Sequence, residues 1–250
     1  MTIDRIRQLV VAAAFMLIAA STASAATFTV NPTQIFLSSR TTTALLTLRN
    51  DSEETLRFQL TAFAWQQAPN GELQLTPTQD VVFFPALLSL APKEERRIRV
   101  GSTVGAAEQE RTYRIFVEEL PSAAGQRENA VRVLTKMGIP IFIRPAKEAA
   151  TADLRDLALR SGALHFTLNN RGSVHFVPQK VLVRAVGAGG ERLLEQELKA
   201  WYVLAGGRRD FELAVPAASC AQVASLLVEV EFNSNLLKET LQTPGGTCVK

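Results

Sequence analysis

Short runs of β-branched and apolar residues, separated by turn-forming residues, are the feature that most constrains the fold of this chain. Between residues 27 and 143 no stretch keeps the period of an amphipathic helix for three turns. Turn signals such as Asn50-Asp51-Ser52 and Pro69-Asn70-Gly71 separate the runs. The pattern predicts the seven strands of a β-sandwich, at residues 27–37, 42–49, 55–65, 80–84, 96–100, 112–119 and 131–143.

A second set of strands follows a stretch at 144–150 that carries proline and charged residues and indicates a linker. Strands are predicted again at 164–168, 174–186, 193–198, 208–213 and 226–233. Two domains of roughly 110 residues each have the size of immunoglobulin-like sandwiches. We therefore expect an all-β chain with two immunoglobulin-like β-sandwich domains, at residues 26–146 and 151–250.

The first 25 residues have the composition of a cleavable signal peptide. Arg5 and Arg7 precede an apolar run at 9–20, and Ala23-Ser24-Ala25 ends the segment. A membrane anchor is the alternative, but this apolar run is shorter than the roughly 20 residues that span a bilayer. We predict export, cleavage after Ala25 and no stable insertion in a membrane.

Charge and cysteine content exclude several classes of function. Removing residues 1–25 lowers the formal net charge from +3 to +2, because Arg5, Arg7 and Asp4 are lost, and this excess is too small to favour nucleic-acid binding. Two cysteines, Cys220 and Cys248, predict a disulfide in an exported chain. A redox pair or metal site is the alternative, but it would need C-x-x-C spacing or neighbouring histidines. We expect no metal and no cofactor.

Residues that could support catalysis are scarce. The only histidines, His165 and His175, lie in predicted strands, where a lone histidine is more often structural than catalytic. The sequence contains neither G-x-S-x-G nor H-E-x-x-H, and its glycine-rich segment at 187–190 lies between strands, as in a hairpin loop. We therefore expect that the chain is not an enzyme.

The segments 111–121 and 131–137 both alternate polar and apolar residues, which predicts an antiparallel hairpin. A loop centred near residue 125 predicts three cross-strand pairs, namely Glu118 with Arg132, Phe116 with Leu134, and Val117 with Val133. The same register places Arg114 opposite Lys136. Two facing cations are unfavourable unless an anion lies between them. Both side chains could instead extend into water; the sharper prediction is a site for a partner's carboxylate.

The last strand of this domain is unusually apolar near the hairpin tip. Val131, Val133, Thr135 and Met137 share one face, and Leu134 lies on the other. Simple core packing accounts for residues 139–143, but an exposed apolar strand invites aggregation unless a partner covers it. An extended segment of another protein can add to such a strand, and we expect the free form to self-associate through it.

These segments resemble the periplasmic pilus chaperones of the chaperone–usher pathway, the PapD-like family. The matching residues are YRIFVEELP at 113–121, FFPALLSLAPKEERRIRV at 83–100, and the strand that ends in Phe142-Ile143-Arg144-Pro145. The match covers the first domain, whereas the second domain matches only in size and general pattern. The run Ile-Pro-Ile-Phe-Ile at 139–143 is more similar to the archaic, or spore-coat-like, branch.

The resemblance implies an L-shaped pair of domains that folds and caps pilus subunits by donor-strand complementation and delivers them to an outer-membrane usher. By alignment, the donor residues would be Val131, Val133, Thr135 and Met137. Hydrolysis of a nucleotide is not expected to drive release, and strand exchange with another subunit would replace it.

In the family, two basic residues of the cleft bind the terminal carboxylate of the subunit. The aligned positions here are Gln34 and Pro140, so we shift the predicted anchor to Arg114 and Lys136. The resemblance also implies that Glu110 and Arg144 form part of an interdomain ion-pair set.

Two other functions remain open from the sequence. An exported adhesion or scaffold module could have the same two sandwiches and bind another surface protein without folding it. A pilus subunit is the weaker alternative, because subunits are usually single incomplete domains and this chain is predicted to contain two complete ones.

Overall fold

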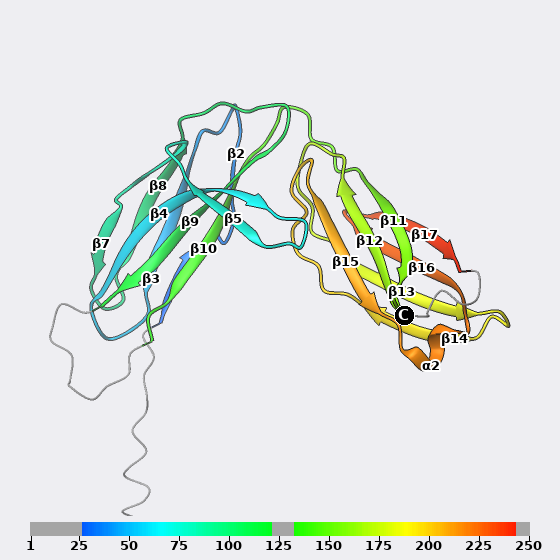
Figure 1. The fold of residues 1–250 in the computed structure, drawn as a ribbon. Helices are drawn as coiled ribbons and strands as arrows, with labels where there is room; N and C mark the ends of the chain where they lie inside the picture. The colour runs from blue at the N-terminus through cyan, green and yellow to red at the C-terminus, as the bar shows by residue number, and fades with distance from the viewer. Residues whose placement is uncertain (1–26, 122–132, 244–250) are drawn as a thin grey trace, which may run out of the picture.

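A computed structural model describes residues 27–121 and 133–243 of the chain (Figure 1). It shows two β-sandwiches inclined to each other and joined at one end, which confirms the predicted fold class. No described helix combines the length and apolar character needed to cross a membrane. The predicted cleavage site, donor residue Val131 and Cys248 lie outside the described residues.

The first sandwich packs a sheet of order β1-β3-β8-β6 against a sheet of order β2-β10-β9-β4-β5, with β7 also paired to β4. Its strands are β1 Phe28–Asn31, β2 Ile35–Leu37, β3 Thr43–Asn50, β4 Leu56–Gln67, β5 Leu73–Pro77, β6 Val81–Phe84, β7 Leu87–Leu90, β8 Glu95–Ser102, β9 Arg111–Leu120 and β10 Lys136–Ile143.

The predicted strand at 27–37 is two strands in different sheets. β1 pairs with β3, whereas β2 runs parallel to β10 in the opposite sheet. Pro32 lies between them, and proline has no N–H to donate to a ladder. The single-strand prediction was wrong at this point, because residues 32–34 carry the chain from one layer to the other.

The core of the first sandwich contains the inward-facing residues of both sheets. Ile115 and Val117 of β9, and Ile139 and Ile141 of β10, are at most 1% exposed. Along each strand these buried residues alternate with residues that point to the other face of the sheet, as in any pleated strand. On the opposite face of the sheet, Phe142 of β10 packs against Tyr202 and Leu204 of the second domain.

The second sandwich contains a sheet of order β11-β12-β15 and a sheet of order β14-β13-β16-β17. Its elements are β11 Ala152–Arg160, β12 Ala163–Asn170, β13 Lys180–Gly187, β14 Arg192–Glu197, β15 Arg208–Ala214, α2 Ala217–Cys220, β16 Val223–Phe232 and β17 Asn235–Gln242. Strands β11 and β17 were not predicted. The predicted strand at 174–186 begins only at Lys180, and before it Phe176 forms an isolated bridge with Val203.

Cys220 is 3% exposed and packs in the core of the second sandwich, with Val223 and Leu226 of β16. Since Cys248 lies outside the described residues, the bridge between these two cysteines stays a prediction.

Candidate functional site

One edge of β10 has no strand partner over half of its length. β9 covers the whole of β10 on one side, but β2 covers only Ile141–Ile143 on the other. The backbone N–H of Glu119 donates to Thr135 and that of Arg144 donates to Leu37, so odd-numbered residues of β10 bond to β9 and even-numbered ones face the opposite edge. Within the described residues, the backbone of Lys136–Pro140 is therefore open to an added strand.

A row of apolar side chains leaves the core along this open segment. Ile139 is 1% exposed, Met137 is half-buried against the same core, and Val133 is 80% exposed. Thr135 between them is also exposed. The core-facing row of β10 thus continues past the end of the sandwich, where no described residue covers it. A partner strand that pairs with the open edge would also meet these side chains.

The hairpin forms, but its predicted register is wrong. Glu118 lies opposite Lys136, Val117 opposite Met137, and Phe116 opposite Gly138, so every pair is displaced by four residues from the prediction. The three predicted cross-strand pairs, Glu118 with Arg132, Phe116 with Leu134 and Val117 with Val133, are therefore not formed.

The displaced register also separates the two predicted anchor cations. Arg114 lies opposite Pro140, not opposite Lys136. Lys136 has an acceptor of its own, since its Nζ lies 2.8 Å from Oε2 of Glu118. The facing cation pair, from which an anion site was inferred, does not exist. Any role of Arg114 therefore has to be inferred from its own contacts.

Arg114 is a buried cation without an acidic partner. It is 7% exposed, and its guanidinium carbon lies 4.3 Å from the ring centroid of Trp65 and 4.7 Å from that of Trp201. Its Nε is buried with no hydrogen-bond partner. Burial lowers the pKa of Arg114, and the nearby Tyr202 partly opposes this. A charge held in this way is stabilised by aromatic faces in place of an ion pair.

The two tryptophan rings that flank Arg114 come from different domains. Trp65 belongs to β4, and Trp201 follows β14 in the second sandwich. Trp65 also joins a buried interdomain cluster with Phe142, Tyr202 and Leu204. Trp65 is 1% exposed, as expected for a core residue, but it is buried between the domains and not in the core of its own.

Glu110 lies at the interdomain contact, but its partner is a histidine. Its Oε1 lies 2.5 Å from Nδ1 of His175 and accepts the backbone N–H of His175 at 3.2 Å. The His175 ring stacks on Phe142 with 3.8 Å between centroids. Arg144 instead pairs with Glu148, at 3.4 Å, and lies over Phe36. Among the described ion pairs none joins Glu110 to Arg144, so the predicted pair does not form.

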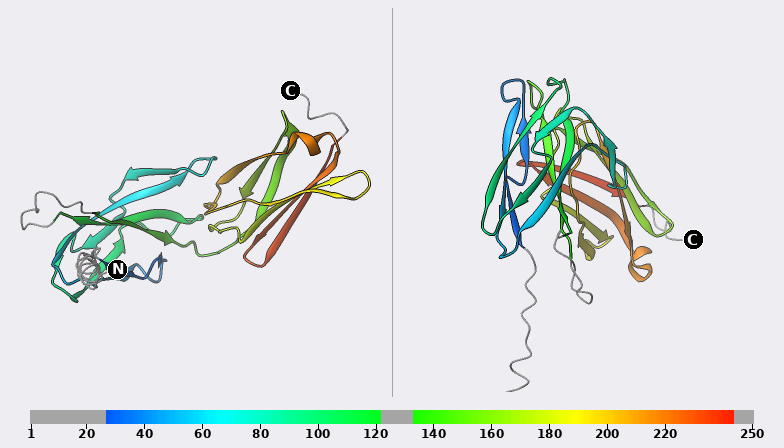
Figure 2. Two further views of the ribbon diagram at one scale, coloured as in Figure 1. Left: turned by 90° about the horizontal axis from the view of Figure 1, so that it is seen from below. Right: turned by 90° about the vertical axis from the view of Figure 1, so that its left-hand side faces the viewer.

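The tip of the β4–β5 hairpin makes a further contact with the second domain, beside β15 (Figure 1). The backbone N–H of Asp210 donates to the carbonyl of Pro69 at 2.8 Å. Arg209 passes over Gly71, where a Cβ would lie 1.4 Å from its Nη1. A Cβ here would require the end of the Arg209 side chain to shift, and the positive φ of 88° favours glycine. The left view of Figure 2 shows the two sandwiches meeting at one end of each.

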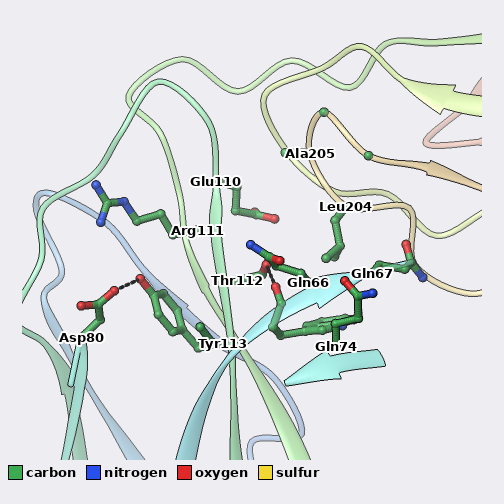
Figure 3. Close-up of a pocket in the computed structure, with 14 residues that line it drawn as sticks. Gln66, Gln67, Gln74, Asp80, Glu110, Arg111, Thr112, Tyr113, Leu204 and Ala205 are labelled. Atoms are coloured by element: carbon green, nitrogen blue, oxygen red, sulfur yellow. Dashed lines mark hydrogen bonds between the residues drawn. The ribbon is translucent and has the colours of Figure 1, made fainter. Parts of the chain in front are cut away.

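A polar cavity of about 410 Å³ opens beside this contact (Figure 3). The hydroxyl of Tyr113 donates to Asp80 at 2.7 Å, and burial together with this bond raises the pKa of Tyr113 to about 12. The side-chain amide of Gln67 is buried without a partner. No group of three or more His, Cys, Asp or Glu residues in the described parts could hold a metal ion.

Comparisons with known proteins agree with the fold. Residues 27–149 match the family model described as "Pili and flagellar-assembly chaperone, PapD N-terminal domain". No curated protein matches the chain. The structure is similar to the class 5 fimbriae chaperone CfaA, with a TM-score of 0.58 and 12% identity over 87% of this chain and 100% of that one.

Two solved complexes are also similar. One contains the chaperone CsuC with the tip adhesion subunit CsuE of archaic Csu pili from Acinetobacter baumannii, with a TM-score of 0.58 and 17% identity over 87% of this chain and 98% of that one. The other contains the SafA pilin and SafB chaperone of Salmonella enterica, with a TM-score of 0.56 and 14% identity over 88% of this chain and 99% of that one. At these identities the similarity shows the shared fold.

Proposed function

Through its PapD N-terminal domain the chain belongs to the pili and flagellar-assembly chaperones, and we propose that it captures pilus subunits by adding β10 to them as a donor strand. The observation that carries this proposal is the unpaired backbone edge of Lys136–Pro140. The same segment also bears the row of apolar side chains that leaves the core. A subunit that lacks a strand would gain main-chain hydrogen bonds from the edge and apolar contacts from the row.

We propose Val131, Val133, Thr135 and Met137 as the donor residues. Full burial of a Val or Met side chain contributes about 1.5–3 kcal/mol, whereas one hydrogen bond to a charged group contributes about 1.5–3 kcal/mol net. Several apolar side chains therefore outweigh a single polar contact. The main-chain edge would set the strand direction, and the apolar row would supply most of the affinity.

We propose Arg114 as the cation that binds the terminal carboxylate of the subunit. It lies opposite Pro140, the position where the family alignment expects a basic residue. Lys136 is proposed as a second anion contact, further along the same strand, where it would have to exchange its bond to Glu118.

The cellular setting follows from the same proposal. Residues 1–25 would direct export to the periplasm, and cleavage after Ala25 would release the domains assigned to 26–146 and 151–250. An outer-membrane usher would receive the captured subunit. Membership of the archaic branch stays a prediction from the run at 139–143.

Periplasmic co-expression with a pilus subunit tests the proposal. A donor-strand chaperone yields a soluble one-to-one complex, whereas an adhesion or scaffold module leaves the subunit degraded. Val133→Asp should abolish recovery of the complex, because a carboxylate would be buried in the apolar groove. The variant itself should stay folded, since Val133 is 80% exposed. Undiminished recovery with Val133→Asp would remove this strand from the mechanism.

A further inference from the structure

Buried polar atoms without partners are concentrated around one cavity between the two domains. Within the described residues, Nε1 of Trp65, both amide atoms of Gln67 and Oε2 of Glu110 are buried and make no hydrogen bond. All three residues line the polar cavity of about 410 Å³ (Figure 3). Native proteins leave few buried polar groups unpaired, because each one loses its hydration without a replacement. Four such atoms around one cavity therefore point to a ligand.

The strand geometry brings these three residues close together. Trp65 and Gln67 are two residues apart on β4, so they share one face of the sheet and lie about 7 Å apart at a rise of about 3.3 Å per residue. β9 pairs with β4, with Ala64 opposite Tyr113. Continued past the end of the ladder, this register places Glu110 opposite Gln67. The spacing suits a ligand with the width of a single ring.

The unpartnered atoms include both donors and acceptors. The indole of Trp65 can only donate, Oε2 of the Glu110 carboxylate can only accept, and the amide of Gln67 does both. The carboxylate would repel an anion. It would attract a cation, but the indole and amide N–H groups would then stay unpaired. A hydroxyl donates through one hydrogen and accepts through two lone pairs. A compact neutral ligand with several hydroxyls therefore matches the whole set.

The rest of the cavity wall combines an apolar side chain with polar groups that are already held in place. Leu204 of the second domain is 7% exposed and lines the cavity. Asp80 accepts the hydroxyl of Tyr113 at 2.7 Å, and Oε1 of Glu110 lies 2.5 Å from Nδ1 of His175. Small-molecule sites have this composition, with apolar contacts for the body of the ligand and a few fixed polar groups that orient it.

We propose that this cavity binds a small neutral polyol of one ring, such as a pyranose sugar. The N–H groups of Trp65 and Gln67 donate to its hydroxyl oxygens, and the side-chain oxygens of Glu110 and Gln67 accept from its hydroxyls. The site is separate from the anchor proposed above, since the described residues that line the cavity do not include Arg114. The proposal does not depend on strand donation.

NMR of the indole N–H groups tests the proposal, because Trp65 and Trp201 are the only two tryptophans of the chain. Trp201→Phe assigns the two signals. The probes are D-glucose and myo-inositol, and the matched control is cyclohexanol, a ring of similar size with a single hydroxyl. We expect the Trp65 signal to shift saturably with either polyol and to stay in place with cyclohexanol. Saturation separates binding from the general exclusion of polyols from protein surfaces.

Gln67→Leu removes both unpartnered amide atoms and keeps nearly the same size. It should raise the Kd for the polyol about tenfold, because hydrogen bonds to the ligand are lost. The variant should fold, since the atoms that it removes are buried without a partner, and its thermal unfolding midpoint verifies this. Gln59→Leu makes the same change at an exposed position of the same strand and should leave the Kd unchanged.

Each outcome bears on one part of the proposal. The absence of a saturable shift with both polyols would leave the cavity to water and overturn the site. An equal shift with cyclohexanol would overturn the class of ligand, and an unchanged Kd in Gln67→Leu would overturn its location. The first two comparisons use the indole signals of an otherwise unaltered protein, so they do not depend on a cavity variant that folds. Capture of a subunit by co-expression tests strand donation separately, and failure of either experiment leaves the other in force.

Discussion

Shortening one donor side chain should weaken subunit binding by an amount that can be worked out from the structure. Val133→Ala removes two methyl groups, each worth about 0.8 kcal/mol on burial. Val133 is 80% exposed in the free chain, so most of this area becomes buried only in the complex. The expected loss is about 1–1.5 kcal/mol, or roughly a tenfold increase in the Kd for the subunit.

The same substitution should leave the free protein almost unchanged, because exposed positions usually contribute within about 0.5 kcal/mol to stability. Urea unfolding of the free chain measures this directly. Competition between the variant and the unaltered chaperone for a limiting amount of subunit measures the change in Kd. Val82→Ala is the matched control, since Val82 is 49% exposed on β6 of the opposite sheet.

Equal affinities for Val133→Ala and Val82→Ala would refute the donor-strand argument. A loss of subunit binding that is matched by a loss in the unfolding free energy of the free chain would refute it as well. In that case Val133 would support the fold of the chaperone and would not contact the subunit.

Three further changes test other parts of the structure. The pKa of Tyr113 is raised from 10.0 to about 12 in the folded chain, so its stabilisation is present below pH 10 and is lost as the pH rises through 12. Between pH 9 and pH 12 the unaltered chain should lose about 2 kcal/mol of unfolding free energy in urea through this group, and Tyr113→Phe should avoid that loss. Phe142→Ala should cost about 3–5 kcal/mol of unfolding free energy, because Phe142 is fully buried between the domains; a loss below about 1 kcal/mol would contradict this. Asn50→Ala should cost about 1–3 kcal/mol in thermal or urea unfolding, because its side-chain amide donates to three backbone carbonyls; unchanged stability would show that water replaces it.

The strand pattern of the first domain could be predicted because each strand buries one face. β3, β4, β8 and β9 lie within two residues of their predicted bounds. β5 was missed because its alternation of leucine with Gln74 and Thr76 covers only four residues before Pro77, and all five of its residues are exposed. β7, which has only four residues, was also missed.

The contact between the domains could not be predicted from local patterns. Trp65, Phe142, His175 and Tyr202 meet there although the chain separates them widely. Each was interpreted as a residue of its own strand or left without a role. The available signal was the adjacent pair Trp201-Tyr202 after a predicted strand, where two large aromatic residues had no core of their own to fill. Which surface covers such residues is decided by the tertiary structure.

The error in the hairpin register has a simple physical origin. A slip of one residue would turn every apolar side chain to the wrong face, but a slip of four residues keeps all the faces unchanged. The alternation of β9 and β10 therefore allowed both registers, and the core-facing row was predicted although its cross-strand partners were not. The donor-row prediction depends on the face alone and is unaffected by the slip. The anchor prediction depended on which residues lie opposite each other. The hypothesis that Arg114 is the anchor is now supported by the position of this residue between Trp65 and Trp201.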